Sequence, residues 1–212
     1  MKKFKNKNLT ASSKTWIARQ FSDPYTKLAK QKGYRSRSAF KLIEINKKFK
    51  FLKNNLNILD LGSAPGGWSQ VCSEINKNGK NLSIDILDMD KIDNIFFYKK
   101  DFNELDFLDF VNNFFALNKV DIVLSDMAVN TTGNKDLDAM KTNSIALDVV
   151  NLSRVILKPK SSLLVKIFSG KDENILIKNA KDSFKIIERI KPDSSRKESR
   201  EMYLLCRDLK TI

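Results

Sequence analysis

The sequence contains no histidine and only two cysteines among its 212 residues. The absence of histidine excludes Ser-His-Asp triads, Cys-His pairs and the usual zinc ligand sets. Any proton abstraction must therefore depend on lysine, aspartate, glutamate, tyrosine or cysteine. Cys72 and Cys206 lie far apart and show no metal-binding spacing. We expect reduced thiols in the core, with a single disulfide as the alternative.

Long apolar segments are also missing. No apolar run approaches the roughly 20 residues that a membrane span requires. The N-terminal segment Met1–Lys5 lacks the apolar centre of a secretion signal. A transit peptide is the alternative for so basic a start, but the segment continues without a break into sequence that bears motifs. We therefore predict a cytosolic protein that has no contact with a membrane.

Positive charge is concentrated near the N-terminus. Residues 1–50 contain 15 lysines and arginines against two acids, Asp23 and Glu44, whereas the rest of the chain carries 24 basic and 23 acidic residues. Such asymmetry indicates contact with nucleic-acid phosphates. The codon bias of an AT-rich genome is the alternative, but it does not explain the near absence of acids before residue 51. We predict an RNA-binding extension over residues 1–32 and one domain over residues 33–212.

Apolar residues follow two periodicities. The pattern is helical over residues 11–32, with a break at Ser22–Pro24, and over residues 39–52. From residue 57 onward, seven short apolar runs typical of strands are separated by helical stretches, which predicts an α/β fold with a doubly wound, mostly parallel sheet. One of the last two strands can run antiparallel because their connection is short. The expected strands lie at residues 58–59, 82–87, 95–98, 120–124, 163–168, 184–190 and 202–206, and the helices at 67–76, 104–116, 136–157 and 172–182.

The segment Ile58–Trp68 contains the most specific local motif. Its residues, ILDLGSAPGGW, place a glycine turn between a strand and a helix, as in the first βα crossover of nucleotide-binding sheets. The spacing matches neither G-x-G-x-x-G nor a P-loop, and Pro65 lacks an N–H that a pyrophosphate would need. The turn favours a ligand with adenosine and an amino-acid tail but no phosphate. A structural turn without a ligand is the alternative.

Three aspartates lie at the carboxyl ends of predicted strands, at the edge where such sheets bind ligands. Asp85 lies where the second strand places an acid on ribose hydroxyls, and Asp101 follows the third strand, where an adenine edge would lie. Asp126 follows the strand at residues 120–124. Single acids at strand ends are often loop or capping residues. Their order after the glycine turn is more specific than any one of them.

Lys166 interrupts the apolar strand at residues 163–168. A lysine inside a buried strand costs several kcal/mol unless it is paired or deprotonated, which makes a functional role the better interpretation. The alternative is a lysine that reaches solvent from an edge, and the apolar residues on both sides disfavour it. Lys41 and Glu201 are unremarkable by themselves, as a helix surface residue and a strand-end charge.

Five ordered motifs together resemble the FtsJ/RrmJ family, the bacterial and organellar large-subunit ribosomal RNA 2′-O-methyltransferases. They span residues 33–42, 61–70, 125–128, 165–168 and 191–201. The resemblance implies a Rossmann-like S-adenosylmethionine-dependent methyltransferase fold and a Lys-Asp-Lys-Glu tetrad at Lys41, Asp126, Lys166 and Glu201. Glu198 is a rival for the glutamate, but the Ser-Arg-Glu context selects Glu201. Two positions depart from the family pattern, which usually has proline at Val129 and alanine at Ser63.

The family implies transfer of a methyl group from S-adenosylmethionine to a ribose 2′-hydroxyl of large-subunit ribosomal RNA, with S-adenosylhomocysteine as product. The acceptor is expected to be a uridine in the A-loop of the peptidyl-transferase centre. Lys166 would take the hydroxyl proton, for which its amine must be neutral; burial and Lys41 favour that form, and Asp126 and Glu201 oppose it. Asp126 would also face the sulfonium, and Lys41 and Glu201 would position the ribose. The remaining cofactor contacts are expected from Gly66, Trp68, Asp85 and Asp101; no metal is implied, and a monomer is expected.

Two other functions are alternatives. A non-catalytic RNA-binding or ribosome-assembly factor would use the basic extension alone, but the glycine turn and Lys166 argue against it. A transfer RNA anticodon-loop 2′-O-methyltransferase would share the tetrad, but the motif at residues 191–201 resembles the ribosomal group more closely. DNA is disfavoured as acceptor because it lacks the 2′-hydroxyl.

Overall fold

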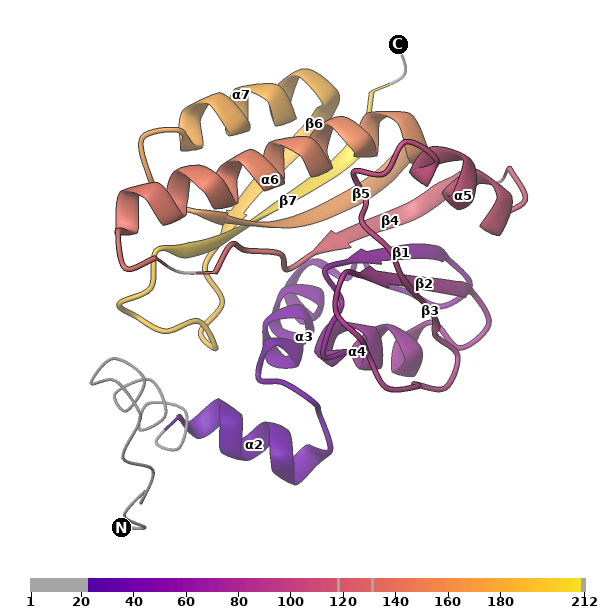
Figure 1. Cartoon of the computed structure of the whole chain (residues 1–212), viewed down its shortest axis with the longest axis horizontal. Helices are drawn as coiled ribbons and strands as arrows, with labels where there is room; N and C mark the ends of the chain where they lie inside the picture. Colours follow the sequence, from indigo (N-terminus) through magenta and orange to yellow (C-terminus); the bar gives the residue numbers. More distant parts are fainter. Residues whose placement is uncertain (1–22, 118, 131, 211–212) are drawn as a thin grey trace.

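The computed structural model describes residues 23–117, 119–130 and 132–210. It contains a seven-stranded sheet with the strand order β3-β2-β1-β4-β5-β7-β6 (Figure 1). Most of the predicted extension and the helical pattern at residues 11–22 lie outside the described residues. The strands are β1 (Asn57–Leu61), β2 (Lys80–Asp85), β3 (Phe96–Lys99), β4 (Val120–Ser125), β5 (Leu157–Phe168), β6 (Phe184–Ile190) and β7 (Glu201–Leu209).

Helices cover both faces of the sheet, as the sequence predicts (Figure 1). One face packs against α3 and α4, and the other packs against α5, α6 and α7, each through its own apolar core. Cys72 lies in the first core and Cys206 in the second; both are buried and unpaired, which confirms the expected thiols. The helices are α2 (Pro24–Lys32), α3 (Ser38–Phe49), α4 (Gly67–Ile75), α5 (Phe107–Phe114), α6 (Lys135–Ile156) and α7 (Glu173–Ser183).

The strands β1 to β5 pair with one another in parallel, whereas β7 runs antiparallel to both β5 and β6. The hairpin from β6 to β7 therefore inserts its second strand beside β5, which confirms the antiparallel strand that the sequence allowed. Its register places Lys166 opposite Tyr203 and Phe168 opposite Glu201. This insertion joins the last motif of the sequence to the middle of the sheet.

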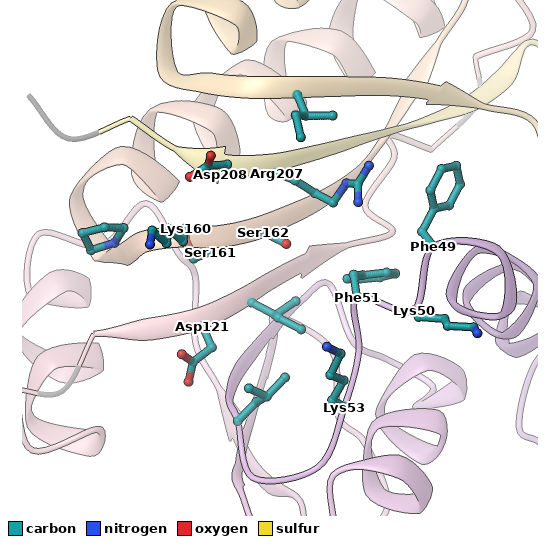
Figure 2. A pocket seen from close by; sticks show the side chains of 14 residues that line it. Phe49, Lys50, Phe51, Lys53, Asp121, Lys160, Ser161, Ser162, Arg207 and Asp208 are labelled. Carbon is teal, nitrogen blue, oxygen red and sulfur yellow. The ribbon is translucent and has the colours of Figure 1, made fainter.

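The strand β5 begins earlier than the pattern indicated. It starts at Leu157 rather than at residue 163, and its pairing with β4 is irregular between Val120 and Ile122. Pro159 and the positive φ of Lys160 explain why the local pattern does not resemble a regular strand there. The irregular stretch borders a cleft at the edge of the sheet that holds the amino ends of β4 and β5 (Figure 2).

The start of α2 follows the predicted break. Asp23 caps the helix by accepting hydrogen bonds from the backbone N–H groups of Tyr25 and Thr26, and Pro24 is its first residue. Gly33 ends the helix in the left-handed conformation that favours glycine. No helix within the described ranges is long and apolar enough to cross a membrane.

Candidate active site

The glycine turn lies at the carboxyl end of β1, between this strand and α4. Gly62 and Gly66 both have positive φ angles, of 72° and 110°. A Cβ on Gly62 would collide with the side chain of Met127, and one on Gly66 would lie 2.7 Å from Ile92. Both positions therefore require glycine, because the backbone has left-handed φ angles and neighbouring side chains occupy the space of a Cβ.

Residues 33–38 fasten α4 to the start of α3. The backbone N–H of Arg35 donates to Gln70, and the indole N–H of Trp68 donates to the carbonyl of Ser38 at 2.9 Å. Trp68 is 2% exposed, so its side chain packs α4 against the core. The predicted cofactor contact of Trp68 would thus come from its backbone, and it stays a prediction.

Asp85 lies at the carboxyl end of β2, and its carboxylate braces the glycine turn. One oxygen accepts the backbone N–H of Ala64 and the other that of Leu87, both at 2.8 Å. Asp101 follows β3 and accepts the backbone and side-chain N–H groups of Asn103 at 2.9 Å. Both acids lie at the predicted edge, but their described partners are within loops. Their contacts with a cofactor stay predictions.

Asp60, which the sequence analysis did not single out, is 2% exposed at the end of β1. Ser69 donates to one of its carboxylate oxygens at 2.7 Å, while the other oxygen is buried with no partner among the described residues. Burial raises the pKa of Asp60 to about 7; the hydrogen bond from Ser69 opposes this rise, and the charges of Asp126 and Asp85 add to it. An acid in a strand of apolar residues was the available signal.

This pKa predicts how stability depends on pH. In the unfolded chain an aspartate titrates near pH 4. The protonated form of Asp60 contributes stability that is fully present below that pH and is lost as the pH rises through about 7. At pH 8 we expect Asp60→Asn to have a higher melting temperature than the wild type and an unfolding free energy larger by up to roughly 4 kcal/mol. This difference should shrink towards pH 5. Thermal melts of both proteins at each pH measure it; a constant difference would contradict it.

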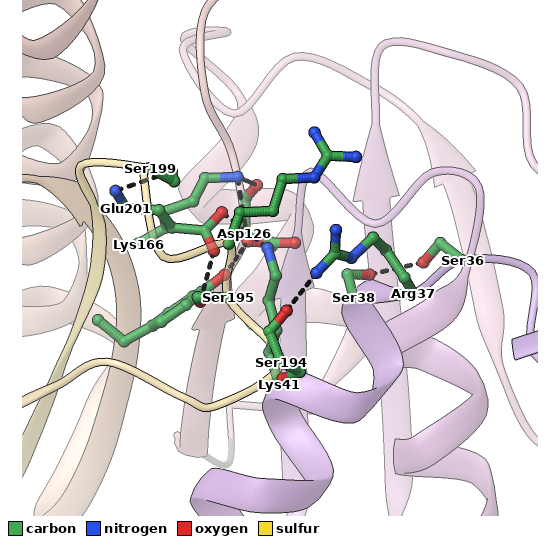
Figure 3. Close-up of polar contacts among 12 residues, drawn as sticks. Ser36, Arg37, Ser38, Lys41, Asp126, Lys166, Ser194, Ser195, Ser199 and Glu201 are labelled. Carbon is green, nitrogen blue, oxygen red and sulfur yellow. Dashed lines mark hydrogen bonds and ion pairs between the residues drawn. The ribbon is translucent and has the colours of Figure 1, made fainter. Parts of the chain in front are cut away.

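The four predicted tetrad residues meet in two ion pairs (Figure 3). The amine of Lys166 lies 3.0 Å from a carboxylate oxygen of Asp126 and donates to the Asp126 carbonyl at 2.5 Å. The amine of Lys41 lies 2.7 Å from a carboxylate oxygen of Glu201. All four side chains are at most 16% exposed. The helix α3 and the strands β5 and β7 thus bring together residues up to 160 positions apart in the sequence.

Tyr203 connects the two pairs and was missed in the sequence. Its hydroxyl donates to Asp126 at 2.7 Å, and the amine of Lys41 lies 5.7 Å from the centre of its ring. Burial raises the pKa of Tyr203 well above its ordinary value, and the charges of Asp126 and Glu201 raise it further. Tyr203 therefore remains a donor. A tyrosine two residues after Glu201 points to the same face of β7, which was the available signal.

Asp126 is ionised in this arrangement. Burial would raise the pKa of its carboxyl, but the ammonium groups of Lys166 and Lys41 and the hydroxyl of Tyr203 lower it below the ordinary value. The negative charge of Asp126 lies beside the glycine turn, because Met127, its neighbour, contacts Gly62. A fixed carboxylate at this position can stabilise a positively charged ligand.

The loop between β6 and β7 closes one side of the cluster (Figure 3). Ser195 donates its hydroxyl to Glu201 at 2.8 Å, which orients the carboxylate towards Lys41. Arg37 binds both the carboxylate of Asp23 and the carbonyl of Ser194. The start of α2 is therefore joined to the loop that orients Glu201, a link that single-residue patterns could not indicate.

This arrangement can remove a proton and hold a cation. The amine of Lys166 contacts both the side chain and the backbone carbonyl of Asp126, and the sequence has no histidine to act as a base. The second pair, Lys41 and Glu201, offers a hydrogen-bond donor and an acceptor to a polar substrate that binds next to Lys166 and Asp126. The pairing keeps the buried charges compensated before any ligand binds.

Known proteins resemble this chain along most of its length. Residues 34–209 match the profile of the FtsJ-like methyltransferase family. A protein of Pelagibacter ubique, named ribosomal RNA large subunit methyltransferase E, is 43% identical over 198 residues, which are 93% of this chain and 97% of the relative. A Rickettsia africae protein of the same name is 42% identical over 207 residues, 94% of this chain and 90% of the relative.

Solved structures share the fold. A Plasmodium falciparum chain, provisionally named a ribosomal RNA methyltransferase, has a TM-score of 0.74 and 34% identity and covers 83% of this chain and 98% of that chain. Human methyltransferase-like protein 13, solved in complex with SAH, has a TM-score of 0.55 at 13% identity, over 77% of this chain and 82% of that chain. The predicted Rossmann-like methyltransferase fold is confirmed.

Proposed function

This chain belongs to the FtsJ-like methyltransferase family, and we propose that it methylates a ribose 2′-hydroxyl of large-subunit ribosomal RNA with S-adenosylmethionine as donor. The observation that carries the proposal is the Lys166–Asp126 pair, which lies beside the glycine turn and next to the second pair, Lys41–Glu201. The names of the two bacterial relatives support the ribosomal RNA substrate. As finer proposals, the acceptor is a uridine of the A-loop, and the enzyme acts as a cytosolic monomer.

The residues at the glycine turn fit the proposed cofactor. The turn is built on glycines with positive φ angles, and two buried oxygens, on Asp60 and Ser63, have no partner within the described residues. Such oxygens suit a ligand that carries an amino group. Gly66, the backbone of Trp68, and Asp85 and Asp101 would hold it, with Asp126 facing its positive charge. When bound, this cofactor supplies an electrophilic methyl group on a sulfonium.

The residues of the cluster have distinct roles in the proposed reaction. Lys166, once deprotonated, would accept the proton of the ribose 2′-hydroxyl, which makes that oxygen the nucleophile. Asp126 orients Lys166 and binds the resulting ammonium. Lys41 and Glu201 hold the ribose by hydrogen bonds, since the pair presents both a donor and an acceptor. The transferred proton thus ends on Lys166, next to a carboxylate that is already charged.

Methyl transfer to defined RNA tests the proposed function. Purified protein with tritiated S-adenosylmethionine should label large-subunit ribosomal RNA, and nuclease mapping should place the label on a ribose. RNA with a single 2′-deoxy substitution at the mapped nucleotide is the matched control and should remain unlabelled. Labelling of a base, or of transfer RNA in preference to ribosomal RNA, would contradict the proposal.

Asp85→Ala should weaken cofactor binding by about 1.5–3 kcal/mol, because it removes a charged acceptor. The same change releases the backbone N–H of Ala64, so the glycine turn also loses a brace. Calorimetric titration with S-adenosylmethionine measures the affinity, and Asp85→Asn, which keeps one acceptor for the turn, separates the two effects. Unchanged affinity in both variants would assign Asp85 to the turn alone.

Deletion of residues 1–22 should weaken RNA binding and leave cofactor affinity unchanged. This boundary keeps Asp23, which caps α2 and pairs with Arg37. The extension contributes phosphate contacts in the proposed role, so the truncated protein should also show a shallower salt dependence of RNA affinity. Equal affinity and equal salt dependence in both proteins would rule out the extension as an RNA-binding segment.

A further inference from the structure

A cleft of about 550 Å³ lies at the edge of the sheet opposite the carboxyl ends that form the active site. It is formed by the loop after α3, the irregular start of β5 and the end of β7 (Figure 2). None of its lining residues belongs to the tetrad or to the glycine turn. The proposed catalytic steps therefore leave this cleft without a role.

Cations approach the cleft from two sides. Lys50 and Lys53 come from the loop after α3, Lys160 comes from β5, and Arg207 comes from β7 (Figure 2). The three lysines form no ion pair with any described residue, in contrast to the lysines of the active site. Unpaired ammonium groups around a cleft attract an anion of high charge density.

Each acid that lines the cleft has one cationic partner, although the Oδ1 of Asp208 is buried and has no hydrogen-bond partner among the described residues. Asp121 is bound by the amine of Lys158 at 2.9 and 3.0 Å, and Asp208 pairs with Lys185 at 3.2 Å. Asp121 also accepts the backbone N–H of Asn57. The charge that remains for a ligand is therefore positive.

Two of the residues that line the cleft carry buried donors without partners. Ser161 is 6% exposed, and its hydroxyl has no hydrogen-bond partner within the described part of the chain. The Nε of Arg207 is buried and likewise unpartnered, while another nitrogen of this guanidinium lies 3.3 Å from Glu188. A buried polar group without a partner is unfavourable. Both groups donate hydrogen bonds, so an acceptor-rich ligand such as a phosphate would satisfy them.

Strained backbone is concentrated around the cleft. Lys50, Lys160 and Asp208 have backbone φ angles of 51°, 63° and 62°, values that residues other than glycine rarely adopt. Lys50 occupies the left-handed position after α3, where glycine is preferred. Strain of this kind persists only where the surrounding structure holds the backbone in place, and it is frequent at ligand-binding sites.

The cleft and the active site are connected by shared elements. Ser162 of the cleft and Lys166 lie on the same strand, β5, four residues and about 13 Å apart at the usual rise. Lys41 is in α3 and Lys50 caps the same helix, nine residues and about 13 Å further along. A single strand of RNA that enters the active site can therefore reach the cleft within a few nucleotides.

We infer that this cleft binds a backbone phosphate of the RNA substrate, several nucleotides from the methylated ribose. The inference rests on the proposed function, because it takes RNA as the substrate. Lys50, Lys53 and Lys160 supply the charge, and Ser161 and Arg207 supply the fixed donors. The site anchors the strand without contact to the reacting atoms.

Charge removal at the cleft tests this inference. The variant in which Lys50, Lys53 and Lys160 are all changed to alanine should bind a fluorescent A-loop fragment of large-subunit ribosomal RNA more weakly. The slope of log affinity against log salt concentration should fall by about two, since each phosphate contact in single-stranded RNA contributes about 0.7. Calorimetric affinity for S-adenosylmethionine and the melting temperature should not change.

A control variant removes the same charge elsewhere. Lys77, Lys178 and Lys181 are exposed lysines that do not line the cleft, and their joint replacement by alanine should leave the salt slope near that of the wild type. Equal losses in the two variants, or no loss in the cleft variant, would overturn the inference. If the cleft variant loses affinity for inorganic pyrophosphate but not for RNA, the phosphate comes from a small molecule and RNA is excluded as the occupant.

Ser161→Ala gives an independent measurement. Removal of a buried hydroxyl without a partner should maintain or raise the melting temperature, and it should weaken RNA binding in the same assay. Unchanged RNA affinity would remove Ser161 from the site. If the wild-type protein labels ribosomal RNA and the cleft variants bind RNA normally, only the inference that the cleft binds RNA is refuted. Wild-type protein that labels no RNA at all would refute the proposed function.

Discussion

Lys166→Arg is expected to abolish methyl transfer while the protein stays folded and binds S-adenosylmethionine. Arginine retains the positive charge beside Asp126, so the ion pair and the compensation of the buried carboxylate persist. A guanidinium remains protonated at any pH at which the protein is folded, and it cannot accept the proton of the ribose hydroxyl. Single-turnover transfer to ribosomal RNA measures the effect, with calorimetry for the cofactor and thermal melting for the fold.

Lys166→Met is the matched control for this variant. It removes the charge and the base together while it keeps the length of the side chain, and we expect it to be inactive as well. Near wild-type turnover of Lys166→Arg would exclude proton abstraction by this lysine, and the cluster would then act only by holding the ribose in line with the methyl group.

Local patterns were sufficient to predict the sheet and its binding edge. The glycine turn after residues 58–59 and the apolar run at 120–124 lie where short-range chemistry determines the structure. The start of β5 was not predictable, because its pairing with β4 is irregular and contains Pro159 and the left-handed Lys160. Tertiary pairing stabilises this stretch, whereas its own residue pattern does not favour a strand.

The residues of the candidate site also differ in how far the sequence could predict them. Lys166 could be found from the sequence because it interrupts an apolar strand. The spacing from Glu201 places Tyr203 on the same face of β7, but its contact with Asp126 depends on the register of β7, and the contact of Ser195 with Glu201 depends on the path of the loop before β7. Asp101 shows the opposite case: it has the expected position after a strand, yet its described hydrogen bonds remain within its own turn.

The Lys41–Glu201 pair leads to the second large effect. Glu201→Ala leaves the amine of Lys41, whose side chain is 10% exposed, without its carboxylate partner. Loss of one member of a buried pair typically costs about 3 kcal/mol or more, and for a chain of this size that lowers the melting temperature by roughly 6–12 °C. The charge of Asp126 still acts on Lys41, which keeps the loss near the lower limit. Methyl transfer should fall to background because the ribose loses an acceptor.

The double variant Lys41→Met with Glu201→Gln separates stability from activity. It removes both buried charges, so we expect its melting temperature to recover most of the loss, as replacement of a whole buried pair often does. Methyl transfer should remain at background, because neither the donor nor the acceptor for the ribose returns. Thermal melts of the wild type, both single variants and the double variant give the coupling energy of the pair. Recovered turnover in the double variant would show that the pair only compensates charge, and the positioning of the ribose would then fall to Asp126 and Tyr203.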